Sequence, residues 1–518
     1  MKKVLTFTLF FFLKLSLSAQ NITITPNGIT PASNSSYQRL SYDQIIALTG
    51  MQEGDLAYDL TFHCLRIYNN NKWLSLSQQT ANEPNLKMDT YGTDSFSKFS
   101  SIEIDSLKNI YLCGYFNGNI QFGTNILDSE NTYDAFIVKM DASGLVLWIK
   151  HLKSTLGNEE IWDMKIDSNL NVYVTGKYSN TVDFGNGISK NSSGGSDIFI
   201  AKYTTNGILQ WVKSDGGPQD DVGKGLVLDV NDNVYVTGEY MDTATFGSNI
   251  TTRTSSGNSD VFLIKYNTNG IFQWVKSEGG TGSDYSNAIT IDINNNIYYT
   301  GTFTSTANFG TNTFNSAGSY DIFVIAFSST SSFLWSIAIG GTGYEVPFDI
   351  ECDFKSTDPI HLVGQFEGTV QFSNNYTKAS IGKRDGFFLR INTTGYVQYV
   401  TQLGSVEDDA ITSIKIDNSG NYAKYISGYY GADAIFDKIS LKNNSFSSKS
   451  SFFARLMGNY YYATNLKWIT TIPKYFYTNT INFQSEDIYF VGNIELVDNS
   501  GSSIFTDYKA ALINVIEP

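Results

Sequence analysis

LVLDVNDNVYVTGEYMDTATFG at residues 226–247 and SDVFLIKYNTNGIFQWVKSEGG at residues 259–280 form a text that the chain repeats along most of its length. The pattern returns as ITIDINNNIYYTGTFTSTANFG at residues 289–310 and, earlier, as KIDSNLNVYVTGKYSNTVDFG at residues 165–185. One glycine marks each copy: Gly114, Gly176, Gly238, Gly301, Gly364, Gly428 and Gly492. Their successive spacings are 62, 62, 63, 63, 64 and 64 residues. A period this regular indicates an array or a closed ring of equal units.

Each copy contains four segments with the features of strands. In the copy around Gly238 they cover residues 226–229, 234–240, 261–266 and 271–276. Asn269-Gly270 suits a tight hairpin between the last two segments, and no helical period is visible. The sequence therefore predicts an all-β fold, a seven-bladed β-propeller built from four-stranded antiparallel blades.

The residues that the copies share also resemble a known family. In order they read D-x-x-x-N-x-Y-V-T-G, F-G, D-x-F-x-x-K, N-G-x-x-x-W and G-G, which is similar to the SBBP-type β-propeller repeat of secreted bacterial proteins. The resemblance runs from Leu86 to the C-terminus. It weakens where Tyr399 replaces the tryptophan of the earlier copies (Trp148, Trp211, Trp274 and Trp335) and at the last two marker glycines. It implies an architecture and carries no activity.

The two ends of the repeat region predict how the ring closes. The last copy stops at Pro518 without a tryptophan strand. Before the first copy, LKMDTYG at residues 86–92 aligns with WVKSDGG at residues 211–217. We therefore expect the N-terminal strand to supply the outer edge of the last blade, because this pairing removes an open sheet edge.

The residues before the repeats predict three further segments. Residues 1–19 have the charged start, apolar run and small-residue cleavage site of a secretion signal, with cleavage near Ala19. Residues 20–38 read as a flexible lead-in, and residues 39–80 as a small stub with a short helix and a hairpin. The stub resembles a GDLxYD…CLxxYNxxKW segment that precedes larger domains in secreted bacterial proteins. Residues 81–518 are assigned to the propeller.

Charge and cysteine usage limit the partners. Without the lysines of the predicted signal (Lys2, Lys3 and Lys14), 32 basic residues face 50 acidic ones, a net charge of −18. Such a surface repels phosphate backbones and anionic lipid, so we expect no nucleic-acid partner and no membrane insertion after signal cleavage. Cys64, Cys113 and Cys352 do not form a disulfide framework. We expect a monomer that is secreted, periplasmic or held at the cell surface.

Five loop carboxylates carry the sharpest chemical hypothesis. Each lies eight residues before the aspartate of a repeat turn: Glu159, Asp221, Asp284, Glu345 and Asp409. The predicted topology places all five in loops on one face near the channel mouth, where a ring of oxygens could hold a hard cation such as calcium. The favoured alternative is that each carboxylate accepts N–H bonds within its own glycine-rich loop, with no cofactor.

The remaining motifs predict structural roles. His63, His151 and His361 are isolated, and no Ser–His–Asp set is visible. The turns at residues 231–233 and 294–296 lack the glycine and distal glutamate of a calcium loop. No helix follows the Gly-Gly pairs (Gly216-Gly217, Gly279-Gly280 and Gly340-Gly341), so they are not phosphate loops. The recurring tryptophans are expected to pack between blades.

The favoured function is a non-enzymatic scaffold that binds a protein or a glycan. Long polar segments at residues 186–196, 248–259 and 311–319 predict variable loops on a rigid ring, where contacts are well tolerated. One alternative is a hydrolase or lyase of polysaccharide that uses carboxylates at the channel mouth. Carboxylates made equivalent by a repeat argue against it, because catalysis needs two different environments. The other alternative is a structural spacer in a surface assembly.

Overall fold

The computed structural model describes residues 96–456, apart from residues 131, 155, 355–359, 419–422, 437–440 and 442–448; elsewhere only the backbone of the strands is described. The chain divides into two compact units, residues 1–83 (with 518) and Pro84–Glu517. Strands account for the regular structure, and no helix in the described residues could cross a membrane.

The first unit carries six strands: β1 (Ile24–Thr25), β2 (Gly28–Ile29), β3 (Gln38–Leu40), β4 (Leu56–Asp59), β5 (Cys64–Asn69) and β6 (Lys72–Ser75). β3 pairs parallel with β4, and β4, β5 and β6 follow one another as antiparallel neighbours. The β4–β5 pairing lies where the sequence predicts a hairpin. The predicted signal at residues 1–19 and the predicted helix that starts at Ser41 lie outside the described residues.

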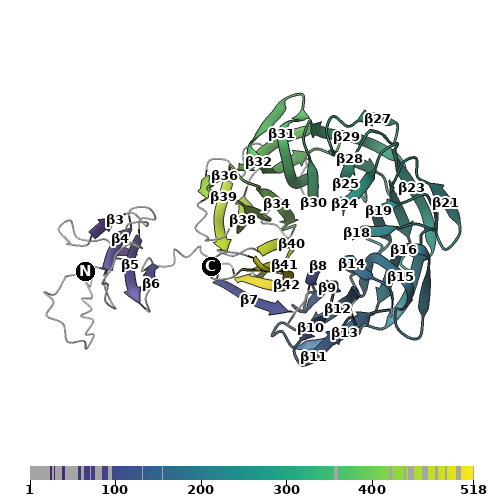
Figure 1. Cartoon of the computed structure of the whole chain (residues 1–518), viewed down its shortest axis with the longest axis horizontal. Coiled ribbons are helices and arrows are strands. Elements are labelled where there is room, and N and C mark those ends of the chain that lie inside the picture. Colours follow the sequence, from purple (N-terminus) through teal and green to yellow (C-terminus); the bar gives the residue numbers. More distant parts are fainter. Residues whose placement is uncertain are drawn as a thin grey trace. The chain divides into compact units, whose positions relative to one another are not determined.

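The second unit is all-β and has a propeller-like arrangement. Its four-stranded antiparallel sheets surround a common centre, and each contributes its first strand to the inside (Figure 1). Within each sheet the strands are given from the centre outward. The first three sheets are β8 (Ser97–Ile104), β9 (Ile110–Phe116), β12 (Asp134–Met140), β13 (Val146–Leu152); β14 (Glu159–Ile166), β15 (Val172–Asp183), β16 (Ser189–Tyr203), β17 (Leu209–Asp215); and β18 (Val222–Leu228), β19 (Val234–Tyr240), β22 (Asp260–Tyr266), β23 (Phe272–Gly280). The sheets that follow are β24 (Asp284–Ile291), β25 (Ile297–Phe303), β28 (Asp321–Phe327), β29 (Phe333–Gly341); β30 (Val346–Cys352), β31 (Ile360–Ser373), β32 (Tyr376–Ile391), β33 (Val397–Gly404); β34 (Ala410–Ile416), β35 (Lys424–Tyr430), β38 (Ser450–Met457), β39 (Asn465–Ile472); and β40 (Phe476–Gln484), β41 (Asp487–Val497), β42 (Ser503–Ile516), β7 (Asn85–Tyr91). β7 pairs antiparallel with β42.

The apolar core lies between neighbouring sheets. One buried cluster joins Val227 and Leu263 of one sheet to Ile289 and Phe323 of the next. The recurring tryptophans cross the same boundary: Trp211 Nε1 donates to the carbonyl of Thr268, 3.1 Å away in the following repeat. Burial between like sheets accounts for the repeated apolar positions, since each sheet has an apolar face only its neighbour can cover.

The marker glycines lie opposite a β-bulge in the inner strand. Gly238 pairs with Gly223, and the register shift between Gly223 and Gly225 leaves Lys224 unpaired. A Cβ on Gly238 would overlap the carbonyl oxygen of Val222 and lie 2.8 Å from the ring of Phe262. The glycine is therefore required by close backbone approach. The bulge also explains why β18 begins at Val222, earlier than the predicted start at Leu226. It interrupts the alternation of inward and outward side chains, so the residues before it do not look like part of the same strand in the sequence.

We expect Gly238→Ala to destabilise the second unit by about 3 kcal/mol or more, because the new methyl group meets backbone on one side and a buried ring on the other. Gly144→Ala is the matched control. Its methyl group would meet nothing within 4 Å, so only the positive φ of 86° opposes it, at about 1 kcal/mol. Urea unfolding of the two variants measures the difference, and equal losses would contradict the role assigned to the marker glycine.

Each polar segment predicted to be a loop contains one strand of a β-hairpin, which corrects the sequence expectation: residues 189–196 belong to β16, residues 251–254 form β21 and residues 312–315 form β27. The outer hairpins of the second unit are β10 (Asn119–Phe122) with β11 (Asn125–Asp128), β20 (Thr243–Phe246) with β21 (Thr251–Thr254), β26 (Thr306–Phe309) with β27 (Asn312–Asn315), β36 (Ala434–Phe436) with β37 (Ile439–Leu441), and the extended ends of β15–β16 and β31–β32. Figure 1 shows β11, β21 and β27 at the periphery. Their short alternation is too brief to distinguish from a polar loop by sequence.

Several of these hairpins join a sheet to the one before it. In β23, Gly279 pairs with Asn308 and Gly280 with Ala307 of the following hairpin. A Cβ on Gly280 would overlap the carbonyl of Thr306, so the Gly-Gly pair permits the contact. We use the word junction for this backbone pairing together with the loop that leads from it to the next inner strand, here the loop from Gly280 to Asp284. Gly340-Gly341 pair with β31 in the same way, and Gly216 bridges Thr245.

Candidate functional site

The aspartate of each repeat turn uses its carboxylate oxygens to accept hydrogen bonds within that turn. Asp229 Oδ1 accepts the N–H groups of Asn231 and Asn233 at 2.9 and 3.0 Å. Its Oδ2 accepts Asn233 Nδ2 at 2.8 Å and Tyr235 Oη at 3.1 Å. Asp292 makes the same four bonds. The D-x-x-x-N-x-Y pattern is thus a hydrogen-bonded turn, and the described residues contain no group of three or more His, Cys, Asp or Glu placed to hold a metal.

The five loop carboxylates lie in separate junctions. Each is buried and accepts an N–H bond within its own loop: Glu159 from Ser154, Asp221 from Gly217, Asp284 from Gly280, Glu345 from Gly341 and Asp409 from Ser405, at 2.5–3.0 Å. Within the described residues they are not brought together. No three of them form a group placed to hold a metal ion in the described residues. Each makes a bond of the kind that the local alternative predicts, and whether a cation binds stays a matter for the experiment with calcium.

Each loop carboxylate instead faces a second carboxylate from the preceding sheet. Asp260 Oδ1 and Asp284 Oδ2 lie 2.7 and 2.6 Å from the position that a Cβ on Gly279 would occupy. Asp260 Oδ1 and Asp284 Oδ1 are buried and have no hydrogen-bond partner in the described part of the chain. The pairs are Asp134 with Glu159, Asp197 with Asp221, Asp260 with Asp284, Asp321 with Glu345, and Asp385 with Asp409. The repeated aspartate of D-x-F was the sequence signal for this partner.

Burial in the junction dominates the acidity of these groups. It raises the pKa of Asp284 to about 7, against the N–H bond from Gly280 and together with the negative charge of Asp260. Burial likewise raises the pKa of Glu159 to about 8 and of Asp221, Glu345 and Asp409 to about 7. The junctions therefore favour protonated carboxyl groups at mildly acidic pH.

The histidines are structural where they are described. His151 was expected to be isolated, but its Nε2 lies 2.6 Å from Oδ2 of buried Asp134. His361 is buried, and its ring centroid lies 5.6 Å from that of Phe388. His63 lies outside the residues whose side chains are described.

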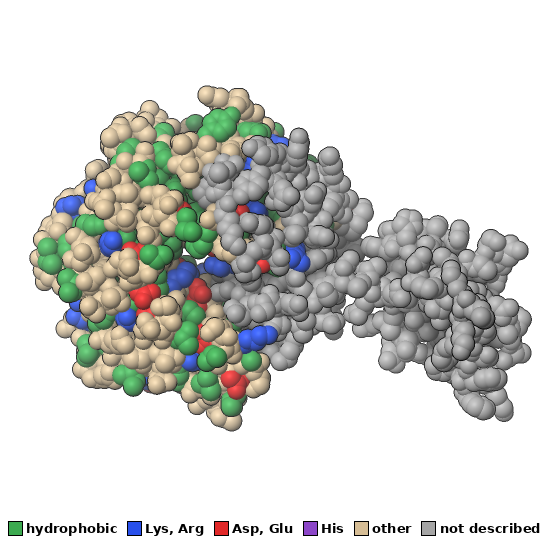
Figure 2. All heavy atoms as spheres, turned by 180° about the vertical axis from the view of Figure 1, so that it is seen from behind, with side chains coloured by type: hydrophobic (Ala, Val, Ile, Leu, Met, Phe, Trp, Pro, Cys, Tyr) green, Lys and Arg blue, Asp and Glu red, His purple; other side chains and the backbone are tan. Residues whose placement is uncertain are grey.

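The inner strands enclose a cavity of about 320 Å³ at the centre of the second unit, which we call the central channel. It is lined by residues of β8, β14, β18, β24, β30 and β34. Figure 2 shows lysine and acidic side chains gathered around the central hollow. The cavity is in the size range of small-molecule sites.

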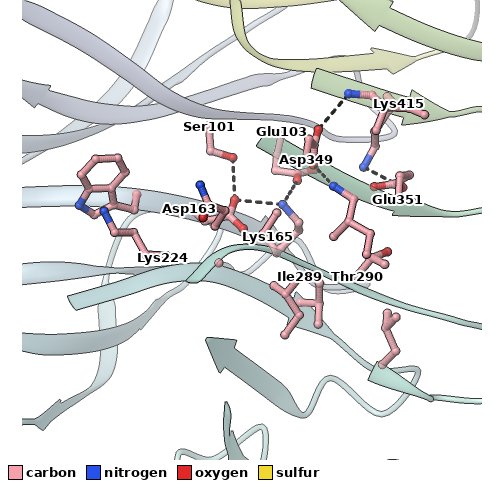
Figure 3. Close-up of a pocket in the computed structure, with 18 of the residues that line it drawn as sticks. Ser101, Glu103, Asp163, Lys165, Lys224, Ile289, Thr290, Asp349, Glu351 and Lys415 are labelled. Atoms are coloured by element: carbon pink, nitrogen blue, oxygen red, sulfur yellow. Dashed lines mark hydrogen bonds and ion pairs between the residues drawn. The ribbon is translucent and has the colours of Figure 1, made fainter. Parts of the chain in front are cut away.

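The charged residues deep in the central channel are paired with one another. Lys165 Nζ lies 3.1 Å from Glu103 Oε1 and 3.1 Å from Asp163 Oδ1, and Lys415 Nζ lies 3.4 Å from Glu351 Oε1 (Figure 3). Glu103 and Asp163 hold the pKa of Lys165 well above its usual range despite burial. The two Glu–Lys pairs each join two sheets. Glu103 of β8 contacts Lys165 of β14, and Glu351 of β30 contacts Lys415 of β34.

The bulges place a different set of side chains at one level of the channel. In the six inner strands whose side chains are described, the residue left out of register is Ser100, Trp162, Lys224, Asn287, Phe348 or Thr412. The first five line the cavity. These positions differ from copy to copy, whereas the turns and junctions repeat. These residues were not predicted from the sequence. The signal that could have found them is that their positions vary between copies while the positions around them repeat.

A cation–π group lies at this level. Lys224 Nζ is 3.5 Å from the ring centroid of Trp162, and Lys98 Nζ is 4.5 Å from it. Burial and the charge of Lys224 lower the pKa of Lys98 to about 8. Burial raises the pKa of Glu239 to about 7, although Lys224 opposes it from 3.9 Å. Two lysine ammonium groups thus lie over the Trp162 ring, with Glu239 beside one of them.

No family model matches the chain. An uncharacterized WD repeat-containing protein of Acanthamoeba polyphaga mimivirus is 29% identical over 275 residues, which cover 45% of this chain and 19% of that protein. This chain therefore spans about a fifth of that relative's length. Together with the sheet arrangement, the likeness supports a β-propeller repeat protein.

Two solved structures are similar over most of the chain. A DUF4221 family member from Bacteroides vulgatus has 11% identity and a TM-score of 0.31, with 85% of this chain and 100% of that chain covered. The exotype rhamnogalacturonan lyase YesX has 11% identity and a TM-score of 0.29, with 88% and 80% covered. Similarity this low supports no statement about the activity of this chain.

Proposed function

We propose that this protein is a secreted, non-enzymatic scaffold of the SBBP type, a seven-bladed β-propeller closed by β7 that binds a protein or glycan ligand at or outside the cell surface. Its apolar start at residues 1–19 supports export, and the β7–β42 pairing supports closure. The repeat spacing supports the number of blades.

One observation carries the binding role. The polar residues that repeat are used by the ring itself, in turns such as that of Asp229 and in junctions such as that of Asp284. The side chains that differ between copies are collected at the central channel by the bulges. A binding scaffold built from repeats needs residues that are the same in every copy to support the fold and residues that differ between copies to contact the ligand. The repeated turns and junctions provide the first set, and the bulge residues provide the second.

The arrangement of carboxylates favours binding over hydrolysis. Glu103 and Glu351 in the channel are each engaged by a lysine, and the junction carboxylates are enclosed. Glycoside hydrolysis needs two carboxyl groups facing a substrate in different environments. We therefore propose that the ligand is bound and not chemically changed.

A glycan array and a protein-binding screen, both with the mature full-length chain, test the proposal. We expect saturable binding of at least one ligand class, and no release of reducing sugar when bound polysaccharide is incubated with the protein. Reducing-sugar release would instead establish the hydrolase alternative. Absence of any ligand in both screens would favour a structural spacer.

A further inference from the structure

We infer that the central channel binds the carboxylate group of a small molecule through Lys224 and Asn287. This inference deepens the proposed function, because it names the ligand chemistry of the channel. It concerns two adjacent inner strands, β18 and β24, whose bulge residues both line the cavity.

The acceptors in the wall of the channel are already occupied. Asp163 Oδ2 accepts the N–H of Leu226 at 2.9 Å, and its Oδ1 accepts Ser101 Oγ at 3.0 Å. Asp349 Oδ2 accepts Ser413 Oγ and the N–H of Ile414, both at 2.9 Å. Because Glu103 and Glu351 face lysines, a ligand that enters the channel finds few free acceptors.

The donors at the bulge level make no hydrogen bond within the described part of the chain. These are Lys224 Nζ and the side-chain amide of Asn287; Lys224 also forms a long ion pair with Glu239 Oε1 at 3.9 Å. Ser100 Oγ and Trp162 Nε1 are also buried there without a hydrogen-bond partner. Leaving the buried donors of Ser100 and Trp162 without a partner is unfavourable, so this wall is complementary to a group that only accepts hydrogen bonds.

The charge and the size of the site select the class of ligand. Lys224 is held against Trp162, and the nearby charge of Lys98 adds to the positive potential. Phe348 and Ile289 supply apolar surface beside these donors. A carboxylate on a body no larger than a hexose matches the donors and a cavity of about 320 Å³.

Isothermal titration of the mature full-length chain with D-glucuronate, acetate and D-glucose at pH 7 and low salt tests this inference. We expect D-glucuronate to bind, acetate to bind more weakly, and D-glucose to give no signal, because the carboxylate is the anchoring group. Raising the salt to 0.5 M should weaken binding, since exposed charge is screened. Lys224→Met should reduce the affinity at least tenfold and Asn287→Ala about fivefold.

Lys150→Met is the matched control, because Lys150 lies on the outer strand β13 and does not line the channel. It should leave the affinity unchanged, and thermal melting should show that all three variants are folded. Equal binding of D-glucose and D-glucuronate, no binding of either carboxylate, or an unchanged affinity in Lys224→Met would overturn the inference. If a macromolecular ligand bound the parent chain while neither carboxylate did, the scaffold function would stand and the channel assignment would fail. If the carboxylates bound as expected and both screens found no macromolecular ligand, the channel assignment would stand and the scaffold function would fail.

Discussion

Deletion of residues 20–92 is expected to lower the melting temperature of the second unit by roughly 10 °C, whereas deletion of residues 20–80 should shift it by about 1 °C or less. The longer deletion removes β7, which pairs with β42 from Asn85↔Ile516 to Tyr91↔Ala510. Without it β42 becomes an open sheet edge, and the proposed closure of the ring between the two ends of the chain is lost. The shorter deletion stays within the first unit.

Differential scanning calorimetry of the two truncations at equal concentration measures the effect. Met88→Pro in the full chain is an independent probe, because Met88 pairs with Ile513 and proline removes an N–H from that pairing. Equal melting temperatures for the two truncations would show that β7 does not close the ring.

The second large effect concerns pH, and we expect the melting temperature to fall by roughly 5–10 °C between pH 5 and pH 8. The junction carboxyl groups have pKa values of about 7 or 8, raised first by burial, against ordinary values near 4. The folded state therefore holds protons that the unfolded chain releases. Their stabilising contribution is fully present below the unfolded pKa and is lost as the pH rises through the folded pKa.

Asp284→Asn tests one junction of this set. Asparagine is neutral at every pH and has the shape of the protonated acid, so the variant should melt slightly above the parent at pH 5, and this advantage should be roughly 2 °C larger at pH 8. Asp242→Asn, at an exposed aspartate, is the matched control and should leave the pH dependence unchanged.

Calcium provides the contrast at pH 8. If protons alone neutralise the junctions, 1 mM calcium should leave the melting temperature where a chelator leaves it. A calcium-dependent rise that disappears in Asp284→Asn would show that a cation occupies the junction instead.

The repeat period and the strand order could be predicted because they depend on local residues. Gly238 recurs where two backbones meet, and Asn269-Gly270 marks a tight turn, so each signal lies within one copy. The outer hairpins could not be predicted, because four residues of alternation in β26 and in β27 do not differ from a polar loop. The pairing of β26 with β23 of the preceding copy adds no pattern within either copy.

The candidate site divides in the same way. The loop role of Asp284 follows from the glycines beside it, but its partner Asp260 comes from another sheet and was missed. The channel residues were missed for a different reason. A bulge displaces Lys224 from the alternation of its strand, and alternation is the pattern by which sequence assigns a side chain to a face.

The junctions also bear on how such a chain can evolve. Because main chain meets main chain at each Gly-Gly pair, this part of the joint between two copies does not depend on their side chains. Duplication of a gene segment that encodes one whole copy therefore reproduces the backbone contact, while the apolar surfaces of neighbouring sheets must still match. Each copy remains free to acquire its own inward-facing side chain.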